Sequence, residues 1–95
     1  MVDTSVIRKE LSETVAKGEA VQRLLKNKDF KQIVLEYYFK DTMTGLSHSL
    51  ANQYKPEFRQ AITEQILSRG HLSNFLNMII EDGNRAVTEL REMEQ

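Results

Sequence analysis

The chain contains no cysteine and no tryptophan among its 95 residues. Without thiols it can form no disulfide framework, no thiol nucleophile and no cysteine-ligated zinc or iron–sulfur site. Small domains that fold in oxidising compartments usually carry disulfides. We therefore expect a reducing environment, the cytoplasm of a cell.

Long apolar runs are also lacking. No stretch approaches the ~18 consecutive apolar residues that a membrane-spanning helix needs. The first five residues, Met1 to Ser5, show no basic segment followed by an apolar run, which is the pattern of a secretory signal. The sequence predicts a soluble protein that has no membrane partner.

Strand signals are absent, and the residues that interrupt helices are few, with one proline and four glycines. No alternating apolar run lies between turn residues, as it would in a hairpin. Apolar residues recur instead every three or four positions, which is the helical period. The pattern predicts an all-α fold, a small single-domain bundle of about four helices. Oligomerisation could complete the core of this bundle.

Turn and cap residues set the expected bounds of these helices, which are 4–25, 29–51, 56–69 and 72–93. Asn27 suits the end of the first helix in a left-handed conformation, and Asp29 suits the cap of the second. Pro56 suits the first position of the third helix, where a missing N–H is tolerated. Gly70 is expected to terminate that helix.

The fourth predicted helix has the most regular apolar stripe, and Gly83 and Ala86 lie inside it. Such small residues would let another helix approach closely, whereas the alternative is a break at Gly83. Charge supports packing between the chain ends. Residues 1–31 carry seven basic and five acidic groups, or +2, and residues 81–95 carry two and five, or −3. We expect the two ends to pack antiparallel.

The second predicted helix is apolar on two sides. At 100° per residue one stripe contains Phe30, Ile33, Val34 and Tyr37, and the opposite stripe contains Leu35, Phe39, Met43, Leu46 and Leu50. A helix with two apolar faces must be covered on both. Either the helix is continuous and sandwiched, which we expect, or it kinks near Thr42 to Gly45.

Catalytic and metal sites find little support. The two histidines, His48 and His71, are 23 positions apart, and a zinc site needs about four ligands. Asp41 lies two helical turns before His48, too far for a hydrogen bond in a straight helix. No phosphate-binding, dinucleotide or calcium motif is present. We predict no catalytic residue, no metal and no cofactor.

The overall charge of −1, from 13 basic and 14 acidic residues, gives no general attraction to nucleic acid. One local basic cluster nevertheless lies at the first joint, formed by Arg23, Lys26, Lys28 and Lys31. No predicted helix has the basic face that recognition of DNA through a helix-turn-helix requires. A DNA-associated helical protein is therefore the alternative and not the main prediction.

Three adjacent aromatic residues point to an interface. Tyr37, Tyr38 and Phe39 spread over about 200° of one helical turn, so a small core covers some of them and not necessarily all. Tyr38 lies about 80° off the first stripe, so it is either exposed at an interface or half-buried over the first predicted helix. Tyrosine offers a large apolar face with a polar tip, which suits protein contacts. Met43 continues this surface, and Met78 projects from the polar side of the fourth helix. These five residues are the predicted interface with a second copy or another protein.

One family resemblance supports that prediction. Asp29-Phe30, the run Ile33 to Asp41, and the later pattern Gly70-x-Leu72-x-x-Phe75-Leu76-x-x-Ile79-Ile80 resemble short helical proteins of tailed bacteriophages, over about residues 22–94. The resemblance implies a viral protein of the host cytoplasm with an oligomeric or virion-associated role. It transfers no functional residue. A small inhibitor that binds a host enzyme is a further alternative.

Overall fold

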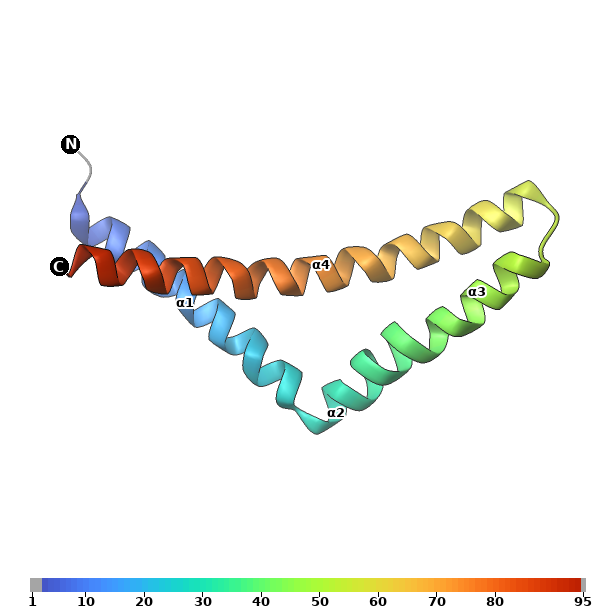
Figure 1. Ribbon diagram of the computed structural model, residues 1–95, viewed down its shortest axis with the longest axis horizontal. Helices are drawn as coiled ribbons and strands as arrows, with labels where there is room; N and C mark the ends of the chain where they lie inside the picture. Colours follow the sequence, from blue (N-terminus) through green and yellow to red (C-terminus); the bar gives the residue numbers. More distant parts are fainter. Residues whose placement is uncertain (1–2, 95) are drawn as a thin grey trace. The chain divides into compact units, whose positions relative to one another are not determined.

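The computed structural model describes residues 3–94, and over this range the chain is all-α, as predicted (Figure 1). The described residues form three helical runs. The first is α1 (Thr4–Lys26) and the last is α4 (Pro56–Met93). The middle run consists of α2 (Lys28–Phe30), the π-helix η1 (Lys31–Asp41) and α3 (Thr42–Asn52).

These helices belong to two compact units. Residues 3–24 and 75–94 form one, called the terminal unit below, and residues 25–74 form the other, called the hairpin unit. The long helix α4 supplies a segment to each. Four of the described residues are buried, and all belong to the terminal unit: Gly18, Val21, Gly83 and Ala86.

The first helix starts at a side-chain cap. Asp3 accepts a hydrogen bond from the backbone N–H of Ser5 at 2.9 Å and another from its hydroxyl at 2.8 Å. The side-chain bond, followed by the backbone bond, lowers the pKa of the Asp3 carboxyl below its ordinary value. A charged carboxylate is therefore favoured at this helix N-terminus, where the helix dipole also attracts it.

The joint after α1 differs from the expectation. Asn27 has φ −67° and ψ 130°, which is extended and not left-handed, and its side-chain oxygen accepts from the N–H of Phe30 at 3.0 Å. Asn27 therefore caps the second run, the role predicted for Asp29. An asparagine side chain satisfies a free N–H of the first helical turn, and this favours the extended backbone.

The predicted break at Gly70 is wrong. α4 continues from Pro56 to Met93 through Gly70 and His71, so one helix replaces the expected helices 56–69 and 72–93. Residues 3–94 accordingly form three helical runs and not the four helices of the predicted bundle. The physical reason is phase: the less exposed positions on both sides of Gly70, including Ile66, Ser73 and Leu76, continue one helical spacing. A single glycine destabilises a helix by only about 0.5–1 kcal/mol, too little to end it.

Gly70 lies where a side chain would meet nothing, because a Cβ built on it has no neighbouring atom within 4 Å. Gly70→Ala is therefore expected to raise the free energy of unfolding by about 0.5–1 kcal/mol through helix propensity alone. Urea denaturation followed by far-UV circular dichroism measures this change. A loss of stability would show that Gly70 needs a conformation or contact that only glycine provides.

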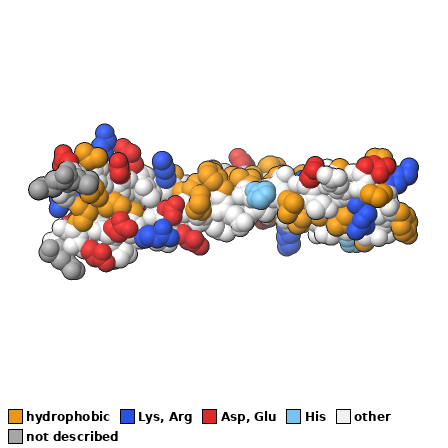
Figure 2. All heavy atoms as spheres, turned by 90° about the horizontal axis from the view of Figure 1, so that it is seen from above, with side chains coloured by type: hydrophobic (Ala, Val, Ile, Leu, Met, Phe, Trp, Pro, Cys, Tyr) orange, Lys and Arg blue, Asp and Glu red, His pale blue; other side chains and the backbone are white. Residues whose placement is uncertain are grey.

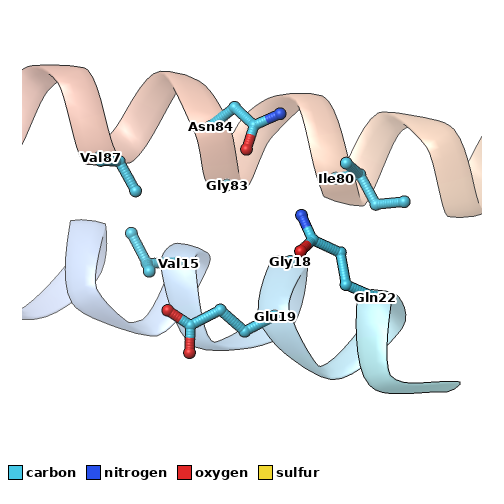
Figure 3. Close-up of a pocket in the computed structure, with 8 residues that line it drawn as sticks. All are labelled: Val15, Gly18, Glu19, Gln22, Ile80, Gly83, Asn84 and Val87. Carbon is cyan, nitrogen blue, oxygen red and sulfur yellow. The ribbon is translucent and has the colours of Figure 1, made fainter. Parts of the chain in front are cut away.

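In the terminal unit α1 and the end of α4 cross at two glycines, as the small residues of the sequence predict. A Cβ built on Gly18 would lie 3.2 Å from the Gly83 Cα and 3.3 Å from the carbonyl oxygen of Ile79. Val21 and Ala86 are buried beside this crossing. Val15 on α1 faces Val87 on α4 across the adjoining groove, whose volume is about 200 Å³ (Figure 3).

The middle run is helical throughout, because Phe30, Asp41 and Thr42 all have right-handed helical torsion angles. It continues without interruption through Thr42 to Asn52. Its central segment is nevertheless wider than an α-helix: the N–H of Thr42 bonds to the carbonyl of Tyr37, five residues back. This is the i→i−5 pattern of a π-helix, which usually occurs as a single turn and here extends over 11 residues.

The wider turn corrects the prediction of two apolar faces. With about 4.4 residues per turn, successive side chains are about 82° apart and not 100°. The less exposed positions then fall within about 115° of arc, where the α-helical spacing spreads them over about 180°; they are Phe30, Val34, Leu35, Tyr38 and Phe39. The π-helix therefore gathers members of both predicted stripes onto one face. Among the stripe members up to Phe39, Ile33 and Tyr37 stay outside it, each 59% exposed.

Candidate functional site

The five predicted interface residues fall into two groups. Tyr37 on η1 and Met78 on α4 are exposed, at 59% and 50%. Tyr38, Phe39 and Met43 are half-buried within the hairpin unit. The exposed pair belongs to different units, and the structure brings together only the members of the half-buried group.

Tyr38 is engaged inside its own unit. The guanidinium of Arg69, on α4, lies over the Tyr38 ring with 4.4 Å between the guanidinium carbon and the ring centroid. Arg69 Nε donates to the hydroxyl of Thr42 at 2.8 Å, and Arg69 Nη1 donates to the carbonyl of Gln65 at 2.9 Å. The Thr42 hydroxyl in turn donates to the backbone carbonyl of Tyr38. We call Tyr38, Thr42 and Arg69 the junction cluster.

The junction cluster satisfies a carbonyl at the point where η1 becomes α3. When backbone hydrogen bonds change from i→i−5 to i→i−4 along a helix, one carbonyl is skipped, which means that it receives no backbone N–H. The last π-type bond joins Thr42 to Tyr37, so the skipped carbonyl is that of Tyr38. The Thr42 side chain supplies the missing donor, and Arg69 holds that hydroxyl in place. Tyr38 therefore has a structural role that makes it a weaker interface candidate than Tyr37.

Next to this cluster the two arms of the hairpin unit enclose a small hollow. Phe39 and Met43 line it from the middle run, and Arg69, Gly70 and Ser73 line it from α4, around a volume of about 210 Å³. The rings of Tyr38 and Phe39 are 5.5 Å apart and tilted by 53°. These two aromatic residues therefore contact each other, and both are half-buried.

At the other end of the hairpin unit, an arginine side chain donates hydrogen bonds to the backbone beside the loop. Arg59 Nη1 donates to the carbonyls of Leu50 at 2.6 Å and Gln53 at 2.9 Å. These carbonyls lie at the C-terminal end of α3, where intrahelical donors are missing. Sequence periodicity missed both Arg59 and Arg69, because their partners are backbone carbonyls and a hydroxyl on another helix. The only signal was the pair of threonines, Thr42 and Thr44, in mid-helix, where threonine often bonds back to a carbonyl.

The main feature of the protein surface is the number of apolar side chains exposed on it. Figure 2 shows hydrophobic side chains at the surface between the charged ones. Large exposed apolar residues occur on α1, η1 and α4 and in the loop between α3 and α4: Val6, Leu24, Ile33, Tyr37, Tyr54, Phe58, Leu67, Leu72, Phe75 and Met78. None of residues 25–74 is buried. The hairpin unit thus carries much apolar surface and no side chain that it fully covers itself.

The basic cluster is brought together in part. Lys26, Lys28 and Lys31 line one shallow hollow, which Gln32 and Glu36 complete. Arg23 belongs to the terminal unit. All three lysines are exposed, so they could attract an anionic partner, but Glu36 reduces the charge of the hollow.

Neither histidine has a partner residue suited to catalysis in its described surroundings; His48 and His71 are both exposed. Over residues 3–94, no group of three or more histidine, aspartate or glutamate side chains is close enough to hold a metal ion. Within the same range no helix is both long and apolar enough to cross a membrane.

Comparison of the chain with protein-family models, with curated proteins and with solved structures finds no match.

Proposed function

We propose that the chain is a non-catalytic interaction module that associates with further copies of itself. The observation that carries this proposal is the hairpin unit, in which none of the 50 residues from 25 to 74 is buried. Ordering each residue costs about 1–2 kcal/mol of backbone entropy. Complete burial of a large apolar side chain returns about 1.5–3 kcal/mol. Contact with a second copy is the most direct way to bury this unit's apolar side chains.

We further propose that this association takes place during assembly of a phage particle or within it. The resemblance of residues 22–94 to short helical phage proteins supports an assembly- or virion-associated role in a host cell. In such a role the chain would act by burying helix surface against helix surface. Burial of apolar area contributes about 25 cal/mol per Å² before the costs of ordering and of lost rigid-body freedom.

Tyr37 is the residue on which we test the proposal, since it is a large exposed side chain outside the junction cluster. Tyr37→Lys should weaken association by at least about tenfold, because it places a charge in an apolar contact. Analytical ultracentrifugation over a concentration series measures the dissociation constant. Helical content should stay unchanged under conditions where both proteins are fully associated or both fully separated.

Tyr54 provides the matched control. It lies in the loop between α3 and α4 and is 90% exposed, so Tyr54→Lys makes the same chemical change away from the helical surface. Association should be unaffected by this change. Equal losses in both variants would mean that added charge and not the Tyr37 surface is responsible, and no loss in either would remove Tyr37 from the interface.

The lysine hollow favours one second candidate, a protein associated with DNA or another polyanion. Lys26, Lys28 and Lys31 would then contact phosphates, and binding would fall steeply as salt rises because counterions are released. Fluorescence anisotropy with a labelled duplex at two salt concentrations distinguishes this from self-association. Binding that requires the three lysines and falls with salt would favour the second candidate.

A further inference from the structure

One row of exposed side chains runs along the outside of α2 and η1. Lys28, Ile33, Tyr37 and Asp41 follow each other at spacings of five, four and four residues, close to the π-helical period of about 4.4. They therefore lie within about 90° of arc, on the side away from the half-buried face. All four are exposed. We call them the outer row.

The outer row has an apolar centre and opposite charges at its ends. The inner face of η1 already holds the other large apolar residues of the segment, so Ile33 and Tyr37 are not needed to complete it. Lys28 precedes this pair and Asp41 follows it. The charge of the surrounding chain has the same direction: residues 26–31 carry three lysines and one acid, and residues 36–41 carry two acids and one lysine.

We propose that the outer row binds the outer row of a second copy, antiparallel, about a two-fold axis near residue 35. This inference deepens the proposed self-association by naming its surface and its geometry. A two-fold axis makes an interface self-complementary, so that each contact occurs twice. Positions equally distant from residue 35 face each other, and Ile33 therefore meets Tyr37 of the second copy, while Tyr37 meets its Ile33.

Charge favours the antiparallel direction. With the axis near residue 35, Lys28 of one copy lies beside position 42 of the other, next to Asp41. Two opposite-charge pairs then flank the apolar centre. A parallel arrangement would set Lys28 against Lys28 and Asp41 against Asp41, which like charges disfavour. The same polarity makes the second copy a better occupant of this row than a uniformly charged partner.

Introduced cysteines test the geometry, because the chain has none of its own. Lys28→Cys and Asp41→Cys are prepared as separate full-length variants. Each is oxidised alone, and then the two are oxidised as a 1:1 mixture. A disulfide forms only when the two Cα atoms come within about 7 Å. The mixture should give the disulfide-linked dimer at least about tenfold faster than either variant alone.

A Tyr54→Cys variant, oxidised in the same way, measures collisional cross-linking, since Tyr54 lies in the loop and outside the outer row. Cross-linking of Lys28→Cys with itself, or of Asp41→Cys with itself, faster than in the mixture would replace the antiparallel geometry with a parallel one. If the mixture reacts no faster than the loop control while the protein sediments as a dimer, the outer row is not the interface and self-association stands. A protein that sediments as a monomer would overturn both.

Discussion

Gly83→Ala is expected to lower the free energy of unfolding by about 1–3 kcal/mol, the usual effect of overpacking a close contact. The Cβ added at Gly83 would lie 3.1 Å from the Gly18 Cα and 3.5 Å from the Thr14 carbonyl oxygen. Both are backbone atoms, so no side chain can rotate away, and α1 must move from α4. Because Val21 and Ala86 are the buried side chains beside this crossing, such a movement exposes the core of the terminal unit.

Urea denaturation of Gly83→Ala and Gly70→Ala, side by side, isolates this effect. Both substitutions add the same methyl group to the same helix and bring the same gain in helix propensity. The two changes in stability should have opposite signs, negative at the glycine crossing and positive at the open site. If Gly83→Ala were stabilising by a similar amount, α1 and α4 could not approach as closely as the structure shows.

Thr42→Val is expected to destabilise the hairpin unit by about 1–3 kcal/mol, because it removes one hydroxyl with two partners. The Tyr38 carbonyl would lose its donor, and Arg69 Nε would lose its acceptor. Valine has nearly the shape of threonine, so packing changes little. Without the hydroxyl, the Tyr38 carbonyl at the end of η1 is left to water, or the helix changes its hydrogen-bond register to satisfy it.

Thr44→Val is the matched control. The Thr44 hydroxyl also bonds back to a carbonyl, that of Lys40 at 3.2 Å, but it is exposed and has no contact with an arginine. Its replacement should change stability by less than about 0.5 kcal/mol. Backbone chemical shifts of residues 31–41, measured by NMR, should change in Thr42→Val and stay constant in Thr44→Val. Equal stability of the two variants would show that the junction cluster does not hold the π-helix.

Periodicity predicted the helical class and the glycine crossing because both depend on which residue types recur at helical spacing. It could not predict the continuity of α4, because Gly70 can end a helix or lie inside one. The choice depends on whether the residues on both sides share one apolar face, as Ile66 and Ser73 do here. Local residue preference predicted a stop, and the common phase of the two segments overrode it.

The π-helix was beyond the reach of a helical wheel drawn at 100° per residue. The sign of the π-helix in the sequence was the presence of two apolar stripes on one helix. A period of about 4.4 residues brings members of both, such as Val34 and Phe39, onto one face. The contact that ends the π segment involves Arg69, 27 positions after Thr42, and no local pattern indicates a partner so distant.

The predicted interface residues differ in exposure, and the interface itself stays a prediction. Tyr37 and Met78 are exposed, as an interface requires, whereas Tyr38 contacts Arg69 and stabilises its own unit. At 100° per residue Tyr37 falls inside the first stripe and Tyr38 about 80° off it. The structure reverses this order, with Tyr37 exposed and Tyr38 half-buried, because adjacent aromatics exchange sides when the helical period changes. Ile33, which accompanies Tyr37 in the outer row, shares the first stripe with it, and the sequence predicts only that this stripe is covered, by another helix of the bundle or by a partner.

The mass of the protein in solution tests the central claim most directly. Light scattering over a dilution series of the full chain gives this mass, and circular dichroism of the same samples gives the helical content. Self-association predicts at least twice the 11.0 kDa of one chain at high concentration, with mass and helical content falling together on dilution. A mass of 11.0 kDa at every concentration, with undiminished helical content, would contradict the account, because the hairpin unit would then be stable with its apolar surface uncovered.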